Sequence, residues 1–333
     1  MRYATIGTGW ITDAFIEGAK IAGGLKLAAI YSRSESTGKA FAAKYGEVPV
    51  FTDLEKLAKS DIIDAVYIAS PNIFHYPQSK LFLENGKHVI CEKPATATPE
   101  QMKELIELSR RKGLVFMEAI MMRYLPARKT VHNALKRLGN ITTARLDFSQ
   151  LSSKYPIYKS GSLPNVFNPA MAGGCLMDIG IYCVYAAVDF FGYPKKILAS
   201  AGFLKSGADG YGTSVFEYDD KLVTLTYSKT GQSHSGSEIL GDNGTLKINS
   251  ISTLTGVTLI EQNGREQAAK LLVGEIPRPK LMSGEAAAFS DFSSDPSRHR
   301  DEIDSAAEQA LMVSEIMQTI RKQAGIRIAD MPD

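Results

Sequence analysis

The chain has 333 residues, of which 44% are hydrophobic and 22% charged, as in ordinary soluble globular proteins, and this length favours two domains. Its 38 basic and 36 acidic residues leave a net charge of +2, which gives no electrostatic reason to expect nucleic acid or a membrane surface as partner. The sequence shows no apolar leader and no stretch of transmembrane length, and its odd number of cysteines fits a reducing compartment, so we expect a cytoplasmic protein.

A glycine turn follows the first predicted strand, residues 2–6, and precedes a helix that is predicted to end at Ala22. Gly7 permits a tight turn, and Gly9 would let a dinucleotide pyrophosphate approach the backbone N–H groups at the helix start. Thr12 replaces the third glycine of the usual pattern, and a lone G-x-G is a weak signal. Two further candidates for contact with the cofactor begin the helix, Trp10 and Ile11, although Trp10 fits ordinary packing equally well.

The end of the second strand, residues 25–31, indicates which dinucleotide is bound. An NAD site usually carries an acidic residue here for the ribose hydroxyls, but the first acid is Glu35. The guanidinium of Arg33 beside the hydroxyl of Ser32 suits the 2′-phosphate of NADP, because it donates two parallel hydrogen bonds to a dianion. NADP is therefore the expected cofactor and NAD the alternative. Without the upstream glycines, Arg33 would be interpreted as an ordinary surface arginine in contact with solvent.

Strands and helices continue to alternate up to residue 121, which predicts an NAD(P)-binding domain over 1–121 with a doubly wound parallel sheet of the Rossmann type. Ligands of such sheets bind at the carboxyl ends of the strands, so polar residues at those ends are candidates for the cofactor crevice. The expected elements are helices 53–59, 77–85 and 99–112 and strands 65–69, 88–91 and 114–117. The candidates are Ser70, Asn72, His75, Glu92, Lys93 and Arg123.

Lys93 is the charged residue around which we expect the reaction site to be built. It follows Glu92 at the end of a short apolar strand, and Pro94 prevents the strand from continuing. A lysine in this position lies at the sheet edge where open α/β proteins bind their ligands. The position predicts hydride-transfer chemistry beside Lys93.

The three cysteines, Cys91, Cys175 and Cys183, are odd in number and show no C-x-x-C spacing. This argues against a disulfide framework and against a metal site. We expect each cysteine to be a small buried residue rather than a nucleophile.

Beyond residue 121 the pattern becomes mostly strand, which predicts an α+β substrate-binding and oligomerisation domain over 122–333. Turns such as Asp242-Asn243-Gly244 indicate hairpins and hence a largely antiparallel sheet. Helices on one face would leave the other open, and an open apolar face favours a homodimer or homotetramer. Segments 151–170 and 274–297 are interpreted as loops near the site. The expected helices are 126–138 and 301–322, and the expected strands 142–149, 197–204, 213–218, 222–228, 238–240, 245–248 and 257–261.

A further predicted helix, residues 173–191, carries a second set of polar residues. Asp178 and Tyr182 are four residues apart and therefore share a helix face. Gly180 between them has no side chain, which would let a ligand come close. If the helix is considered alone, the alternative interpretation is that Asp178 pairs with another polar group and that Tyr182 packs in the core.

The motifs named at the end of this paragraph, taken together and in their order along the chain, resemble those of the Gfo/Idh/MocA oxidoreductases. The resemblance covers nearly the whole chain. The resemblance implies a Rossmann domain followed by an antiparallel sheet domain, with NAD(P) at the strand ends and oligomers formed through the open sheet. It also implies that Lys93 lies beside the nicotinamide, often with a cis bond to Pro94, and that Asp178 binds a substrate hydroxyl. The motifs are Gly7-x-Gly9, Pro71-Asn72 with His75, Glu92-Lys93-Pro94, Glu118 with Arg123, and Gly173-Gly174-x-Leu176-x-Asp178-x-Gly180-x-Tyr182.

Tyr182 stands where many members of the family, the inositol dehydrogenases among them, have histidine. It resembles members such as dimeric dihydrodiol dehydrogenase and glucose–fructose oxidoreductase, which argues against an inositol as substrate. An ammonium such as that of Lys93 stabilises the phenolate form of a tyrosine, whose pKa is otherwise about 10, so Tyr182 is the expected acid/base.

The expected activity is NADP-dependent hydride transfer to or from a secondary alcohol or carbonyl of a sugar, cyclic polyol or vicinal diol. A non-catalytic NAD(P)-sensing regulator is the alternative, but it would need neither Lys93 nor Tyr182. Glycoside cleavage through transient oxidation is a third interpretation, which Arg33 disfavours because that chemistry uses tightly held NAD.

Overall fold

The computed structural model describes residues 1–263 and 266–328 and divides into two compact units. Unit 1 contains Met1–Tyr124 and Pro277–Leu311, and unit 2 contains Leu125–Ile276 and Met312–Asp333. The first break lies close to the boundary placed after residue 121 from the sequence. The return of residues 277–311 to unit 1 was not predicted, and it makes helix α11 (Arg300–Ala324) contribute to both units.

Unit 1 is built on a six-stranded parallel sheet in the order β3-β2-β1-β4-β5-β6. This order is that of the Rossmann fold, in which the strand order reverses between β1 and β4 and a ligand crevice opens at that point. The predicted doubly wound sheet is therefore confirmed. The strands are β1 (Arg2–Ile6), β2 (Lys26–Tyr31), β3 (Val50–Phe51), β4 (Ala65–Ile68), β5 (His88–Glu92) and β6 (Phe116–Ala119).

The helices of unit 1 start and end largely where the sequence places their caps. Thr98 accepts a hydrogen bond from the backbone N–H of Gln101, and Gly113 ends the same helix in a left-handed conformation. Helix α2 and strand β3 were not predicted. The helices are α1 (Trp10–Ala22), α2 (Glu35–Ala42), α3 (Leu54–Ala58), α4 (His75–Glu84), α5 (Pro99–Lys112), α6 (Met121–Tyr124) and α10 (Arg278–Ser294), with a 3₁₀ turn η1 (Asn72–Phe74).

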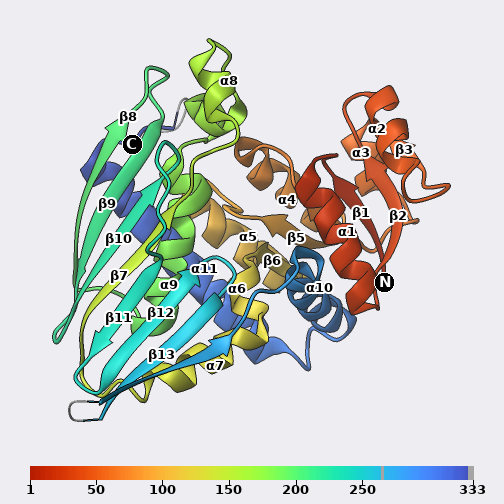
Figure 1. The fold of residues 1–333 in the computed structure, drawn as a ribbon. Helices are drawn as coiled ribbons and strands as arrows, with labels where there is room; N and C mark the ends of the chain where they lie inside the picture. The colour runs from red at the N-terminus through yellow and green to blue at the C-terminus, as the bar shows by residue number, and fades with distance from the viewer. Residues whose placement is uncertain (264–265, 329–333) are drawn as a thin grey trace. The chain divides into compact units, whose positions relative to one another are not determined.

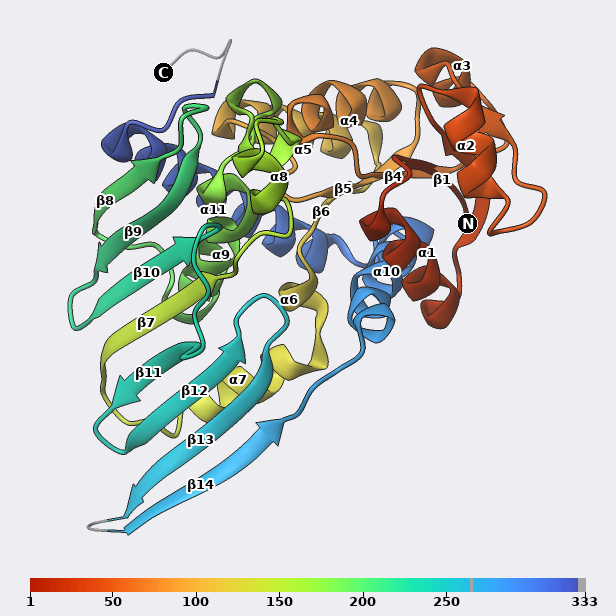
Figure 2. The same cartoon turned by 45° about the horizontal axis from the view of Figure 1, so that its top comes forward.

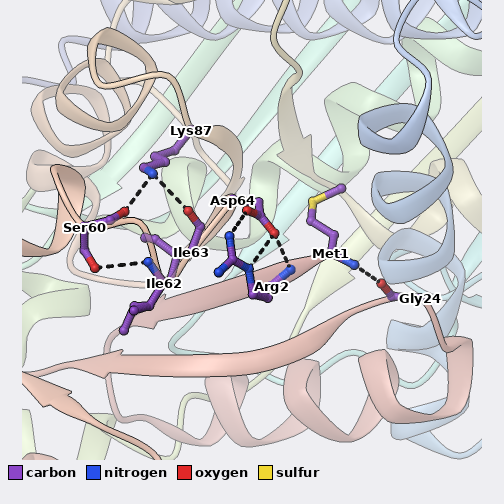
Figure 3. Close-up of polar contacts among 8 residues, drawn as sticks. All are labelled: Met1, Arg2, Gly24, Ser60, Ile62, Ile63, Asp64 and Lys87. Atoms are coloured by element: carbon purple, nitrogen blue, oxygen red, sulfur yellow. Dashed lines mark hydrogen bonds and ion pairs between the residues drawn. The ribbon is translucent and has the colours of Figure 1, made fainter.

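Polar contacts fasten the amino-terminal edge of this sheet (Figure 3). Arg2 forms an ion pair of 2.6 Å with Asp64, which precedes β4. The Lys87 ammonium, just before β5, donates to the carbonyl oxygens of Ser60 and Ile63. These contacts join the amino ends of β1, β4 and β5, so the polar residues at the carboxyl ends are left for ligand binding.

Residues 274–297 were expected to form a loop, but most of them form the 17-residue helix α10. That interpretation was wrong because it took the prolines as breakers. Pro277 is the N-cap and Pro279 lies in the first turn, where proline is tolerated since no backbone N–H is needed there. Met282 and Phe289 are among the apolar side chains that bury α10 within unit 1. Figure 2 shows α10 alongside α1.

Unit 2 is built on an eight-stranded sheet in the order β14-β13-β12-β11-β7-β10-β9-β8. Its pairs are antiparallel except β7–β10, so the prediction of a largely antiparallel sheet is confirmed. The strands are β7 (Ile141–Ser149), β8 (Lys196–Phe203), β9 (Asp209–Glu217), β10 (Leu222–Ser228), β11 (Ser237–Gly241), β12 (Gly244–Ser250), β13 (Thr255–Asn263) and β14 (Glu266–Val273), of which β14 was not predicted.

One face of this sheet is buried beneath helices that include α7 (Pro126–Leu135) and α9 (Ile181–Phe191) (Figure 1). Val223, Leu225 and Tyr227 of β10 are fully buried, as their alternation predicts. The intervening positions point to the other face. There, large apolar side chains are between 40% and 53% exposed, at Leu198, Tyr211, Leu222 and Leu240.

The segment 169–191 passes through several helical forms, and residues 155–171 contain short helices rather than only loop. By length and composition, Pro169–Phe191 could cross a membrane, which corrects the expectation that the sequence has no such stretch. However, 89% of its most apolar window is buried inside the protein, so its hydrophobicity serves the core. The short elements are α8 (Tyr155–Lys159), the 3₁₀ turns η2 (Asn165–Phe167) and η3 (Pro169–Met171), and the π-helical turn η4 (Leu176–Gly180).

Candidate functional site

The turn between β1 and α1 has the geometry that a dinucleotide needs. Gly7 has a φ of 113°, and a Cβ there would lie 2.6 Å from the carbonyl oxygen of Ala69, so only glycine fits. Gly9 is the N-cap of α1 and provides no side-chain cap. A Cβ at Gly9 would meet no atom of the described residues within 4 Å. Open space over an uncapped helix start fits a pyrophosphate group.

Ser32 and Arg33 lie between β2 and α2 in different environments. Ser32 is buried, and its hydroxyl accepts a hydrogen bond of 3.3 Å from the backbone N–H of Ser34. Arg33 is exposed and forms no ion pair within residues 1–263 and 266–328. Its guanidinium is therefore accessible to an anion, as the predicted contact with a 2′-phosphate requires.

Trp10 is 65% exposed at the start of α1, so the alternative of ordinary core packing does not hold. The Arg278 guanidinium from α10 lies 5.1 Å from the centroid of its ring, in the range of a cation–π contact. Ile11, next to Trp10, is half-buried. Arg278 was not recognised from the sequence, because its helix was interpreted as a loop. The contact places a cation next to the glycine turn.

The loop that begins at Lys93 is fixed on both sides by buried side chains. The Lys93–Pro94 peptide bond is cis. His75 is 1% exposed, and its two ring nitrogens lie 2.8 Å from the carbonyl oxygen of Pro94 and 2.7 Å from that of Ser70. Glu118, also buried, accepts a hydrogen bond of 2.7 Å from the backbone N–H of Ala95. These contacts position the Lys93 loop relative to β4 and β6.

The geometry of His75 gives it a structural function, since both ring nitrogens already face backbone carbonyls. Burial lowers the pKa of His75, and a neutral imidazole donates from only one nitrogen. The predicted contact of His75 with a cofactor stays a prediction, as does that of Ser70, whose hydroxyl donates to Gln78. Asn72 begins the turn η1. Arg123 donates hydrogen bonds to Gln309 and Ser305 of α11, and its place at the crevice also stays a prediction.

Glu92 belongs to a set of acidic and phenolic groups beside Lys93. Tyr67, fully buried in β4, donates a hydrogen bond of 2.6 Å to Glu92. Burial raises the pKa of Glu92, and the contacts with Tyr67 and Lys93 lower it. Glu285 of α10 is 1% exposed, and neither carboxyl oxygen has a hydrogen-bond partner among the described residues. Burial and the charge of Glu92 hold the pKa of Glu285 well above its usual range. Burial and the neighbouring charge thus favour the protonated form of Glu285.

In unit 2, Asp178 lies in the π-helical turn η4, and Tyr182 follows it in the first turn of α9. The Tyr182 ring is half-buried and meets Phe148 of β7 edge to face, with centroids 5.5 Å apart. The interpretation of Gly180 as an opening for a ligand was wrong. A Cβ at Gly180 would lie 3.0 Å from the Tyr227 ring, so the space beside the glycine is taken up by packing against the sheet.

Two charged residues near Asp178 were missed from the sequence. Lys229 follows β10 and forms an ion pair with Asp178, and its side chain is only 10% exposed. The signal was present, since Lys229 continues the alternation of the buried residues Val223, Leu225 and Tyr227. Asp209 of β9 is fully buried and accepts a hydrogen bond of 2.7 Å from the backbone N–H of Leu176. Burial raises its pKa to about 6, against the opposing effects of that bond and of Lys229.

A polar pocket of about 220 Å³ opens in unit 2 next to Phe148, the residue that contacts Tyr182. Most of its lining side chains carry hydroxyl, amide or carboxylate groups, and none is Lys or Arg. Such a surface offers hydrogen bonds rather than a positive charge. The lining residues are Asp147, Phe148, Ser149, Gln150, Gln232, Ser233, His234, Gly236, Asn249, Ser250 and Ile251.

The three cysteines are buried, and burial raises the pKa of each thiol. This confirms the prediction that they are small core residues rather than nucleophiles. The free thiols of Cys91, Cys175 and Cys183 form no disulfide.

Two models of known protein families match the chain, one in each unit. Residues 1–120 match the model of the "oxidoreductase family, NAD-binding Rossmann fold", and residues 127–247 match the "GFO/IDH/MocA C-terminal domain". The chain belongs to the Gfo/Idh/MocA family of oxidoreductases. The predicted resemblance is therefore confirmed, and with it the expectation that the chain is an enzyme of this class.

Individual relatives extend this result. The chain is 39% identical to scyllo-inositol 2-dehydrogenase (NADP(+)) IolU of Bacillus subtilis, with 98% of each chain covered. It is 30% identical to human trans-1,2-dihydrobenzene-1,2-diol dehydrogenase, over 67% of this chain and 66% of the relative. Among solved structures, KijD10, a 3-ketoreductase from Actinomadura kijaniata in complex with NADP and TDP-benzene, superposes with a TM-score of 0.83. At 22% identity, covering 97% of this chain and 98% of the other, that match shows the fold alone.

Proposed function

We propose that this oxidoreductase transfers a hydride between NADP and a secondary alcohol or carbonyl of a sugar, cyclic polyol or vicinal diol. The observation that carries the proposal is the carboxyl edge of the sheet of unit 1. There an uncapped helix start follows β1, an accessible arginine follows β2, and a lysine on a fixed loop follows β5. When bound, the nicotinamide would accept or supply the hydride. The names of the NADP-dependent relatives in the family support this choice of reaction.

In this proposal the β1–α1 turn holds the pyrophosphate over Gly9, with Trp10 and Ile11 at the helix start. Arg33 and Ser32 bind the 2′-phosphate. The open space at Gly9 and the accessibility of Arg33 support these assignments. Ser70, Asn72, His75, Glu92 and Arg123 are assigned to the crevice, with His75 acting through the backbone of the Lys93 loop.

Lys93 and Tyr182 have complementary functions in the proposed reaction. Lys93 polarises the substrate oxygen and favours the phenolate form of Tyr182, which then takes the hydroxyl proton during oxidation and returns it during reduction. Asp178 accepts a hydrogen bond from a substrate hydroxyl. All three residues lie within the ranges that the two family models match, which supports their assignment to one reaction.

The range of substrates that we propose includes inositols. Tyr182 had argued against them because many inositol dehydrogenases have histidine at that position. A relative that is named a scyllo-inositol dehydrogenase and is 39% identical over 98% of the chain outweighs that single residue. The apolar side chains on the open sheet face, including Leu198 and Tyr211, support our further proposal that a homodimer or homotetramer forms through this face.

A reduction screen tests the proposed function. The protein is incubated with NADP⁺ or NAD⁺ and a panel of inositols, aldoses and trans-dihydrodiols, and formation of reduced cofactor is followed. We expect turnover with NADP⁺, and we expect Arg33→Ala to raise the KM for NADP⁺ without raising that for NAD⁺. Equal efficiency with both cofactors in the wild type would contradict the function given to Arg33. Tight NADPH binding without turnover of any substrate would favour the NAD(P)-sensing regulator.

A further inference from the structure

We propose that Lys229 is a positioning residue for the reaction, which holds the Asp178 carboxylate in place to accept a substrate hydroxyl. The inference rests on the proposed function, because it concerns how the substrate is bound. Lys229 belongs to none of the motifs by which the chain resembles its family, and it follows β10 in a different part of the sequence from the helix that carries Asp178.

The burial of Lys229 is the first argument. Lysine is rarely buried unless it is paired, because removal of the ammonium from water is costly. Only 10% of the Lys229 side chain is exposed, and it forms an ion pair with the Asp178 carboxylate. Asp178 itself is 29% exposed. The pair is therefore asymmetric: the lysine is enclosed, whereas part of the carboxylate remains accessible from outside the pair.

The backbone around Lys229 is the second argument, since it fixes where the ammonium can reach. The N–H of Lys229 donates 2.9 Å to the carbonyl oxygen of Gly210, and its own carbonyl oxygen accepts 3.0 Å from the N–H of Ser152. Lys229 thus continues the sheet by one buried position beyond Tyr227. A buried lysine whose backbone is fixed in this way confines its partner more closely than a solvent-exposed one would.

Asp209 supplies the third argument. It is fully buried, one of its oxygens accepts from the N–H of Leu176, and its electrostatic interaction with Lys229 favours the ionised form. Asp209 therefore fixes the start of the helical segment that carries Asp178, while Lys229 interacts with both carboxylates. Asp209 thus holds the start of the helical segment through the Leu176 N–H, and Lys229 holds the Asp178 side chain of the same segment through the ion pair.

The consequence for the reaction follows from charge. A carboxylate paired with an enclosed ammonium still accepts hydrogen bonds at its exposed side, because its two oxygens have several lone pairs. Loss of Lys229 would remove this ion pair and hold the Asp178 carboxylate less closely, so the substrate would bind less well. Cofactor binding, which the proposal assigns to the β1–α1 and β2–α2 turns, would be unchanged.

The experiment compares Lys229→Met, Asp178→Asn and the double variant with the wild type, with Lys196→Met as matched control. Lys196 pairs with Glu217 at 3.3 Å on the same sheet, but its side chain is 58% exposed. We expect Lys229→Met to raise the KM for the polyol about tenfold, the effect of one charge-assisted hydrogen bond, with little change in kcat or in NADPH affinity. We expect no further rise when it is added to Asp178→Asn, because both act through one contact.

Several results would overturn the inference. An unchanged KM in Lys229→Met would do so, and so would an equal rise in the wild-type and Asp178→Asn backgrounds. If Lys229→Met does not fold, Lys229→Arg serves instead, since it keeps the charge but moves the carboxylate. It should raise KM by about threefold or more while the thermal midpoint is kept, and an unchanged KM would again refute the inference. Absence of turnover in the wild type would overturn the proposed function as well, whereas a failure confined to the Lys229 variants leaves that function intact.

Discussion

Substitution of Gly9 by alanine should separate cofactor binding from folding. Gly9 has φ −90° and ψ 174°, which alanine adopts freely, and its new Cβ would meet no atom of the described residues within 4 Å. Alanine restricts the unfolded chain, which stabilises by about 0.4–1 kcal/mol, but it is a poorer N-cap than glycine by a similar amount. The free energy of unfolding should therefore change by less than about 1 kcal/mol.

The same methyl group would enter the space that we assign to the pyrophosphate. Displacement of the phosphates from the helix start would weaken hydrogen bonds to a charged group, each of which contributes about 1.5–3 kcal/mol. The Kd for NADPH should rise about 10- to 100-fold. Titration of NADPH fluorescence would measure this Kd, and urea unfolding followed by circular dichroism would measure stability.

Gly7→Ala is the comparison variant, because its large effect should be on stability. At φ 113° alanine is strained by roughly 1–3 kcal/mol, and its Cβ would lie 2.6 Å from the carbonyl oxygen of Ala69. With overpacking of a further ~1–3 kcal/mol, the loss of stability should be about 2–6 kcal/mol. Wild-type affinity for NADPH in a stably folded Gly9→Ala variant would refute the location of the cofactor at this turn.

Three further predictions concern ionisation and fluorescence. Burial raises the pKa of Asp189, but hydrogen bonds from His132 and Arg128 lower it from 3.8 to about 2. The ionised Asp189 should therefore stabilise the folded protein by about 2 kcal/mol near neutrality, and this stability should be lost as pH falls from about 4 towards 2. An acid unfolding curve that Arg128→Leu leaves unchanged would contradict this. Folding raises the pKa of Glu285, so the folded state binds a proton that the unfolded state has lost once pH exceeds 4.5, and the wild type loses stability as pH rises further. Glu285→Gln should therefore gain stability relative to the wild type towards alkaline pH. Parallel thermal midpoints of the two proteins from pH 6 to 9 would contradict a protonated Glu285. Trp10, the only tryptophan, should lose fluorescence when NADPH is added, and emission that does not respond would place it away from the cofactor.

The Rossmann part of the fold could be predicted because its signals are local. The glycine turn, the capped helix at Thr98 and the apolar strands each depend on neighbouring residues, and the structure confirms them. The helix α10 could not be found in this way. Two prolines precede or begin it, and its burial depends on α1, which is distant in sequence. Strand β3, with only two residues, was too short to show periodicity.

The residues of the candidate site likewise include some that local motifs reveal and others that they do not. Lys93, Asp178 and Tyr182 were identified because they lie in motifs with fixed spacing. Lys229 and Glu285 were not, because their chemical meaning comes from partners far along the chain. Gly180 shows the opposite error: its spacing suggested an opening for a ligand, whereas the Tyr227 ring fills the space beside it.

The most direct test of hydride transfer with Tyr182 as acid/base is turnover by Tyr182→Phe at equal cofactor occupancy. NADPH binding would first be measured in wild type and variant, and reduction of NADP⁺ by an accepted polyol would then be followed with cofactor in excess of its Kd. We predict unchanged NADPH affinity and a kcat that falls by at least about 100-fold, the usual contribution of a general acid/base. A variant that binds NADPH normally and turns over at the wild-type rate would contradict the assignment.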